Sequence, residues 1–385
     1  DQIKMLQNKI YQNFIKEILK TFLVILFGLS TIAWTVRAVN FLDLIVENGY
    51  SVATYFQYSI LNLFGILTKF IPLSFLLALI IFIAKQIQEN EFVILWTSGV
   101  KKLKVVNLFF IISLLVIIFY MIFSTLITPY VLNKSRLLLS KAGYNSFLPT
   151  IRVQQFSDSF KGFTFLVEKK SNNEIKNVFI HDKGNVLKNL SPGKFQGNST
   201  TTITAQEGIV KEKAMLLFNG QIVSVSKNKK EIENNIIKFE QLNIDLKSLK
   251  TGTIKNPKLQ ETNTLSLFNC LQEKNTNDLD CNLKAKNEIK TILNRRIVLP
   301  FYIPIIALLC SFLLIKNNSK KNLFFNKNTI FLYSFLILLY AELIIRYTGI
   351  YSIITKIFIA TPFLLIPLIY LFLANKLSKE SKIYE

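Results

Sequence analysis

The stretch VVNLFFIISLLVIIFYMIFSTLI (105–127) decides the fold. It carries no charged residue, and a helix of roughly 20 apolar residues is long enough to cross the hydrocarbon core of a bilayer. Comparable runs precede it at about 18–41 and within 55–84, and others follow at about 297–315, 329–345 and 357–373. The sequence therefore predicts an α-helical integral membrane protein with six transmembrane helices, three on either side of an insertion.

The insertion between the two sets of spans is polar and runs from about Pro129, which we expect to end the third span, to Asn294. Six segments in it are rich in aromatic and β-branched residues: 163–168, 176–180, 201–205, 208–211, 215–218 and 235–245. Asn172–Asn173 and Asn219–Gly220 are typical turn sequences, and the second predicts a hairpin. We expect an all-β, jelly-roll-like domain, so the chain divides into residues 1–128, 129–294 and 295–385.

Basic residues predict the orientation of the spans. Fifteen Lys and Arg residues lie in the N-terminal segment, in loops 85–104 and 316–328 and in the tail, against two in the loops on the other side. Short cytoplasmic loops carry the excess of positive charge. Both termini are therefore expected in the cytoplasm and the insertion outside it. Residues 1–20 alternate lysines with apolar residues, as a basic amphipathic helix at a membrane surface does.

The same reasoning accounts for the net charge of +22. No basic stretch is interleaved with stacking aromatics, so a nucleic-acid partner is not expected. His181 stands alone and cannot form a zinc site, which needs three or four ligands. Cys310 lies in an apolar run, whereas Cys270 and Cys281 lie in the insertion and could pair in an oxidising compartment.

Several chemistries are missing from the sequence. Gly193–Lys194 is followed by Phe195, and no P-loop sequence occurs, so the chain cannot bind ATP through such a loop. It also lacks H-E-x-x-H and G-x-S-x-G. The first three spans have no carboxylate at mid-depth, which argues against an ion-coupled carrier. We therefore expect a membrane protein that is not an enzyme, needs no metal or cofactor, and takes its energy from a partner ATPase.

The connector KQIQENEFVILWTSGVKKLK (85–104) shows how such a partner could bind. Apolar residues recur in it at helical spacing: Phe92, Val93, Leu95, Trp96 and Val100. Glu89 and Glu91 lie near the N-terminal end of the expected helix, at about 88–100, where the helix dipole favours anions. Such a helix suits docking into a groove on an ATPase, with Glu91 facing an arginine. It could equally be a surface helix that anchors the loop.

Two short motifs and the order of the spans resemble the LptF/LptG permease family of the lipopolysaccharide export ABC transporter. The family's loop reads approximately S-E-L-x-A-L-x-A-A-G; this chain keeps Glu91 and Gly99, with Asn90 in place of the serine and Thr97–Ser98 in place of the small pair. Arg296 and Pro300 match an R-x-x-x-P pattern at the fourth span. The sequences at 34–49 and 163–182 are more similar to LptF than to LptG.

The resemblance implies the partners and the coupling residues. Such a permease pairs with a paralogous LptG-like permease in the inner membrane, above a cytoplasmic dimer of ABC ATPases. Its β-domain stacks on an LptC/LptA-like periplasmic bridge, and lipopolysaccharide is the cargo among the membrane lipids. The residues expected to couple to the ATPase are Glu91, Phe92, Leu95, Trp96 and Gly99.

Candidate substrate contacts are the cations Arg37, Lys69 and Arg346. Each has a second interpretation: Arg37 could pair with Asp43, Lys69 could snorkel, and Arg346 could form an intrahelical ion pair with Glu342 four residues earlier. Three aromatic residues of the insertion could hold acyl chains or simply form its core: Phe165, Phe179 and Phe218.

Two other functions remain open on these residues. One is an ABC permease for lipoproteins or peptides, although those mostly have four spans. The other is a membrane sensor with a ligand-binding β-domain, which would need neither a coupling helix nor an ATPase.

Overall fold

The computed structural model describes residues 9–46, 50–143, 153–160, 163–171, 173–183, 199–210, 214–227, 232–245, 258–272, 283–315 and 326–382. These residues belong to two compact units. The first comprises residues 1–36, 61–133 and 257–385 and holds most of the helices. The second comprises residues 37–60 and 134–256 and holds the sheet.

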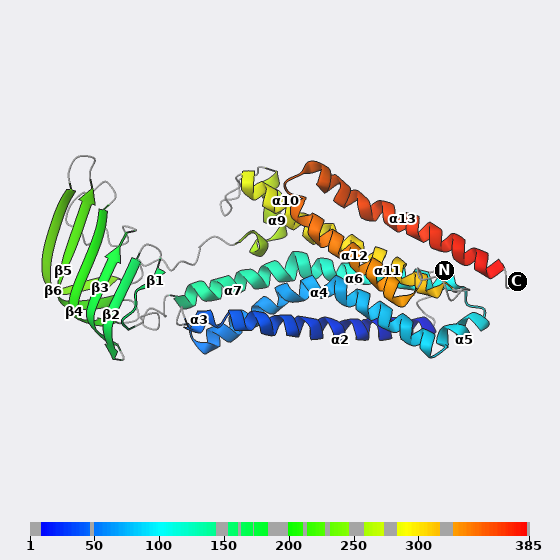
Figure 1. The fold of residues 1–385 in the computed structure, drawn as a ribbon, viewed down its shortest axis with the longest axis horizontal. Helices are drawn as coiled ribbons and strands as arrows, with labels where there is room; N and C mark the ends of the chain where they lie inside the picture. Colours follow the sequence, from blue (N-terminus) through cyan, green and yellow to red (C-terminus); the bar gives the residue numbers. More distant parts are fainter. Residues whose placement is uncertain are drawn as a thin grey trace. The chain divides into compact units, whose positions relative to one another are not determined.

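The predicted spans are present as long apolar helices (Figure 1). Five helices among the described residues are long and apolar enough to cross a membrane, and a bent helix pair makes a sixth. The five are formed by α2 (Lys9–Asn40), α4 (Val52–Gln88), α6 (Lys102–Ile122) with its continuations η1 (Phe123–Ile127) and α7 (Thr128–Gly143), α12 (Lys327–Ile344) with η8 (Ile345–Tyr347), and α13 (Ser352–Lys382). The short α3 (Asp43–Val46) follows α2. This confirms the predicted membrane fold.

The fourth span is the bent pair. Helix α10 (Leu283–Ile297) is followed by η5 (Leu299–Tyr302), α11 (Ile303–Cys310) and η6 (Ser311–Leu314). The axis of residues 285–297 is bent by 43° from that of residues 299–314. Pro300 and Pro304 each lie in the first turn of their segment. A proline is tolerated there because the missing N–H would have no partner inside the helix. The prolines therefore start new segments and set the bend.

The interior of the helical unit is formed by α4, α6 and α11. Phe75, Phe109 and Ile306 are fully buried, and α11 packs against α6, α12 and α13. Of the apolar window of α4, 72% is buried, against 17% in α2 and in α13. The outer helices therefore expose most of their apolar surface, as lipid-facing or partner-facing helices do.

The third span does not end at Pro129, as the sequence suggested, because the helix continues through α7 to Gly143. The π-helical turn η1 ends two residues before Pro129. A π turn adds one residue to a helical turn, and proline cannot donate to the carbonyl of the fourth residue before it. The wider turn accommodates the proline without ending the span.

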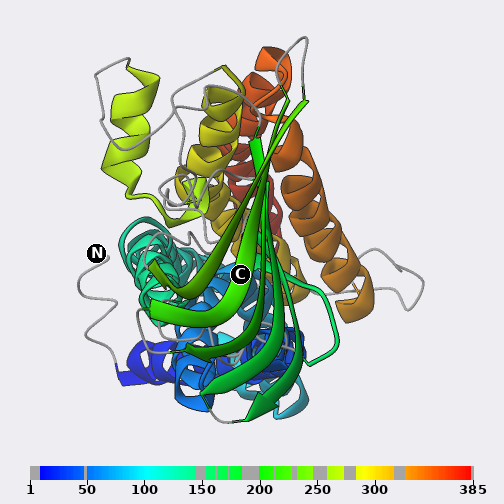
Figure 2. The ribbon, with the colours of Figure 1, turned by 90° about the vertical axis from the view of Figure 1, so that its left-hand side faces the viewer.

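The all-β nature of the insertion is confirmed by six antiparallel strands in sequential order (Figures 1 and 2). They are β1 (Ser157–Phe160), β2 (Phe163–Ser171), β3 (Glu174–Asp182), β4 (Ser199–Val210), β5 (Ala214–Lys227) and β6 (Ile232–Asp245). Figure 2 shows that the sheet is strongly curved. The described strands form one sheet, and the second sheet of a complete jelly roll does not occur among them.

Asn219–Gly220 is not the predicted hairpin, because β5 runs straight through it. Four neighbouring strands instead carry an extra residue at one level of the sheet. On one side of this level the paired residues are Val178, Ala205, Gly220 and Phe239, and on the other they are Ile175, Gly208, Leu217 and Leu242. Paired residues on the two sides are three positions apart in each strand, so one apolar face continues across the level.

Asn219 has a positive φ of 49°, as a bulge residue does. Gly220 next to it packs so closely on β4 that a Cβ atom would overlap the carbonyl oxygen of Thr204. The asparagine–glycine pair is therefore a bulge within a strand, although the same sequence favours a hairpin in isolation.

Of the three aromatic residues expected on the inner face, only Phe165 lies there, and it is fully buried. Phe179 points to the opposite face, since its neighbours Val178 and Ile180 are buried, and it packs edge-on against Phe156. Phe218 follows the buried Leu217 and lies on the same outer face as Phe179. The inner face is a largely aliphatic core that contains Phe165 and, partly buried, Phe239.

Cys270, Cys310 and His181 have ordinary surroundings. Cys310 is a buried free thiol, Cys270 is disulfide-bonded, and Cys281 lies outside the described residues. His181 Nδ1 is 2.9 Å from the Thr202 hydroxyl across the sheet. Among the described residues, no group of three or more His, Cys, Asp or Glu side chains is placed to hold a metal ion.

Candidate functional site

The connector between α4 and α6 contains a separate short helix, α5 (Glu91–Thr97). Asn90, between α4 and α5, has a left-handed backbone with φ of 57°. Asparagine tolerates this conformation better than most residues do. The left-handed residue breaks the long helix and redirects the chain, which gives α5 its own axis.

Gly99 ends α5 for a similar reason. Its amide donates to the Trp96 carbonyl at 3.1 Å, and the amide of Val100 donates to the Leu95 carbonyl at 3.1 Å. This pair of bonds is the Schellman motif, which needs a left-handed residue, and Gly99 has φ of 82°. Gly99 therefore shapes the connector through its left-handed backbone. This structural role was not part of the sequence prediction, which grouped Gly99 with the coupling residues.

The inner face of α5 is fixed to the bundle by aromatic contacts. Phe92 and Leu95 are only 4% and 7% exposed. The Phe92 ring lies edge-on to Phe14 of α2, with centroids 6.3 Å apart, and stacks on Trp96 at 5.7 Å. Phe92 and Leu95 are therefore core residues of this chain rather than a free docking face. Trp96 is half-buried, so its exposure is intermediate between that of the inner and the outer face of α5.

The outer face of α5 is apolar and exposed. Val93 and Ile94 are 54% and 63% exposed, while Thr97 and Ser98 beside them are exposed and Glu91 is half-buried. Four apolar residues in a row, FVIL, cannot all lie on one side of a helix with 3.6 residues per turn. That signal was present in the sequence, but it did not show which pair faces inward.

A polar contact braces α4 just before the connector. Lys85 Nζ lies 2.6 Å from Glu17 Oε1 of α2, and Gln86 Nε2 donates to Glu17 Oε2 at 3.4 Å. The Phe14 ring of the same helix packs edge-on against Phe82 at 5.2 Å. The first turns of α2 thus hold both α4 and α5, so the connector is attached to the spans on more than one side.

The candidate substrate cations are all exposed. Arg37 lies near the end of α2 in the second compact unit, and the side chain of its suggested partner Asp43 is outside the described part of the chain. Lys69 projects from the middle of α4, next to Thr68, whose hydroxyl is 2.8 Å from that of Thr128. The exposure of these three cations fits contact with a partner or a lipid.

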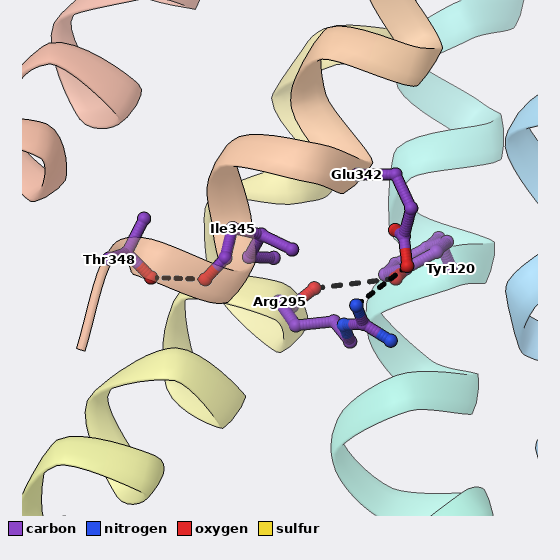
Figure 3. Close-up of polar contacts among 5 residues, drawn as sticks. All are labelled: Tyr120, Arg295, Glu342, Ile345 and Thr348. Carbon is purple, nitrogen blue, oxygen red and sulfur yellow. Dashed lines mark hydrogen bonds and ion pairs between the residues drawn. The ribbon is translucent and has the colours of Figure 1, made fainter. Parts of the chain in front are cut away.

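The predicted ion pair between Arg346 and Glu342 is wrong. Glu342 Oε1 lies 2.6 Å from Arg295 Nη2 on α10 instead (Figure 3). Helix α12 ends at Ile344 and tightens into the 3₁₀ turn η8, so Arg346 no longer lies one α-helical turn above Glu342. Arg346 therefore stays exposed.

Figure 3 also shows that Tyr120 of α6 donates to the Arg295 carbonyl at 3.3 Å and that Thr348 donates to the Ile345 carbonyl at 2.7 Å. Three spans thus meet at the end of α10.

Comparison with known proteins identifies the family of this chain. The sequence model of the family described as lipopolysaccharide export system permease LptF/LptG matches residues 13–378, nearly the whole chain. The chain is also similar to the uncharacterized protein RP871 of Rickettsia prowazekii (strain Madrid E), with 26% identity over 175 residues. That similarity covers 45% of this chain and 48%, about half, of the relative.

Proposed function

The chain belongs to the LptF/LptG family of lipopolysaccharide export permeases, and we propose that it is a permease subunit that moves lipopolysaccharide out of the inner membrane. A separate cytoplasmic ABC ATPase supplies the energy, because the sequence has no P-loop. The observation that carries the proposal is α5, a short helix between two spans with its inner face fixed and its outer face apolar.

In this proposal Val93 and Ile94 enter a groove on the ATPase. Glu91, at the first position of α5, faces a cation there, since a carboxylate at a helix N-terminus can pair outward at little cost. Phe92, Leu95 and Trp96 pass the displacement of α5 to the helical core, because they belong to its apolar cluster and Phe92 packs against Phe14 of α2. The connector is then cytoplasmic and the sheet periplasmic, as the distribution of lysines predicts.

The remaining partners follow from the family. A second, similar permease would cover the exposed outer helices, and the sheet would meet a periplasmic bridge protein. The sequences at 34–49 and 163–182 favour the LptF side of the pair. Arg37, Lys69 and Arg346 are the proposed contacts for lipid phosphates, since an amphiphile needs apolar walls and a few cations near headgroup depth.

Copurification tests the coupling face. The full chain is expressed with the ATPase and extracted in mild detergent, as wild type, Ile94→Asp and the control Ile350→Asp. Ile350 is 62% exposed, nearly the same as Ile94, but lies in the turn between the last two spans. We expect Ile94→Asp to lower ATPase recovery about tenfold, since burying an unpaired carboxylate costs well over 1 kcal/mol, and Ile350→Asp to leave it unchanged. Equal recovery from all three would refute the docking role of α5.

A charge reversal tests Glu91 separately. The Glu91→Lys chain should still fold and bind the ATPase, while ATP hydrolysis no longer drives lipid release. Wild-type transport by this variant would remove Glu91 from the coupling residues.

Photo-crosslinking tests Lys69. If crosslinkers placed beside Lys69 never capture lipopolysaccharide, Lys69 is not a substrate contact.

A further inference from the structure

Arg296 is a buried cation that the coupling face does not use. It lies at the end of α10 and is 5% exposed. Its guanidinium binds the return segment, residues 258–264, which leads from the insertion back to the spans. Nη1 donates to the Thr262 carbonyl at 3.1 Å and to the Thr264 hydroxyl at 2.9 Å, and Nη2 donates to the Gln260 carbonyl at 2.9 Å. One side chain thus holds three alternate residues of the segment.

These three acceptors are uncharged, and no carboxylate among the described residues forms an ion pair with Arg296. A planar guanidinium offers five N–H groups in a fixed fork, whereas an ammonium offers three donors around one point. Only the fork can reach Gln260, Thr262 and Thr264 together. The geometry therefore requires arginine and not merely a positive charge.

The Thr264 hydroxyl extends the contact to the third span. It accepts from Arg296 and donates to the carbonyl of Thr125 at 2.9 Å. Thr125 lies in the π-helical turn η1. Through Thr264, the irregular turn of the span and the return segment share a hydrogen bond.

We propose that Arg296 is a positioning residue for export. It fastens the return segment to η1 through Thr264, so that a displacement of the third span moves the segment leading to the β-domain instead of being absorbed in a loose linker. The inference rests on the proposed function for its consequence, lipid transfer, but its structural part concerns this chain alone.

Hydrogen–deuterium exchange of the full chain in detergent tests the structural part. The variants are Arg296→Lys, Thr264→Val and the control Lys290→Gln, an exposed residue of the same helix. Each lost hydrogen bond raises the equilibrium constant for local opening of the return segment by about a factor of ten. We expect amide exchange in residues 259–271 to rise about tenfold or more in both test variants and not in the control. Unchanged exchange in Arg296→Lys would overturn the proposal. Thr264→Val keeps the shape of threonine and decides the matter if Arg296→Lys does not fold.

Transport separates positioning from simple stability. The variants are reconstituted with the ATPase and the second permease in vesicles that contain lipopolysaccharide. We expect Thr264→Val and Arg296→Lys to keep ATP hydrolysis within about twofold of wild type, because the α5 contacts are intact, while lipid release falls about tenfold, the factor of one lost hydrogen bond. A parallel loss of hydrolysis and release, or no loss of release, would contradict the positioning role. Failure of the wild type itself to release lipid would sink the proposed function and leave the exchange result standing.

Discussion

Two connectors of this chain are attached to the spans through different kinds of contact. The α5 connector is held by rings, with Phe92 against Phe14 and Trp96. The junction at the end of α10 is held by hydrogen bonds from Arg295 and Arg296 to α12 and the return segment. Apolar packing is largely non-directional, whereas a hydrogen bond weakens steeply when its angle changes. Under the proposed function, this difference would let α5 be displaced as a rigid body while the junction keeps its direction.

The largest expected effect lies on the packed side of this comparison. Phe92→Ala removes a buried ring and should destabilise the connector by about 3–5 kcal/mol. The measurement is thermal unfolding in detergent together with the rate of tryptic cleavage after Lys101. Val93→Ala is the control, and as an exposed change it should stay within about 0.5 kcal/mol of wild type. A larger loss in Val93→Ala than in Phe92→Ala would mean that α5 is packed the other way round, and equal losses would contradict the burial of Phe92 alone.

The next effect lies at the junction. A Cβ atom on Gly349 would overlap the carbonyl oxygen of Asn287 on α10. Gly349→Ala should therefore cost about 1–3 kcal/mol through forced displacement of α10. Gly28→Ala is the matched control, because nothing lies within 4 Å of its added Cβ and it sits in the helix α2. A melting temperature as high for Gly349→Ala as for Gly28→Ala would contradict the close contact.

Gly99 offers a smaller test on the α5 side. Alanine in its left-handed conformation costs about 1–2 kcal/mol. Asparagine tolerates that conformation better, so Gly99→Asn should recover part of the loss. Limited proteolysis of the connector compares the two variants. Identical cleavage of Gly99→Ala and wild type would show that the turn does not need φ above zero.

The smallest effect concerns the ion pair of the junction. Arg295 and Glu342 are 32% and 48% exposed at their side chains, and pairs of that exposure contribute about 1 kcal/mol or less. Glu342→Gln should lower the melting temperature only slightly, and salt should lower that of the wild type by a similar amount. A large, salt-independent loss would show that the pair is fully desolvated in the assembled protein.

The sequence predicted what depends on length and composition. The spans follow from runs such as 105–127, and the all-β insertion follows from segments such as Lys176–Ile180, because both patterns persist over many residues. It failed where a neighbour distant in sequence decides the outcome. Pro129 ends a helix unless the preceding turn widens, and Asn219–Gly220 makes a hairpin unless the adjacent strands bulge with it.

For the candidate site, the sequence located the α5 connector. Its coupling residues, Glu91, Phe92, Leu95, Trp96 and Gly99, stay a prediction, and two of them, Phe92 and Leu95, are buried in this chain. The hydrophobicity of FVIL is nearly uniform, so only the position of Phe14 on another helix decides which residues face inward. The Arg346 pairing failed because the helix changes its pitch two residues before that arginine.

The aligned bulges in β3 to β6 fix the pairing register of these strands relative to one another. The buried residues of each strand have one parity before that level and the other parity after it, as Ala205 and Gly208 show in β4. Deleting Gln206 alone would put half of β4 out of phase and turn its aliphatic side chains toward solvent. Insertions and deletions are therefore tolerated in the loops of this domain. Within these four strands, a residue can be removed or added only if the neighbouring strands change at the same level.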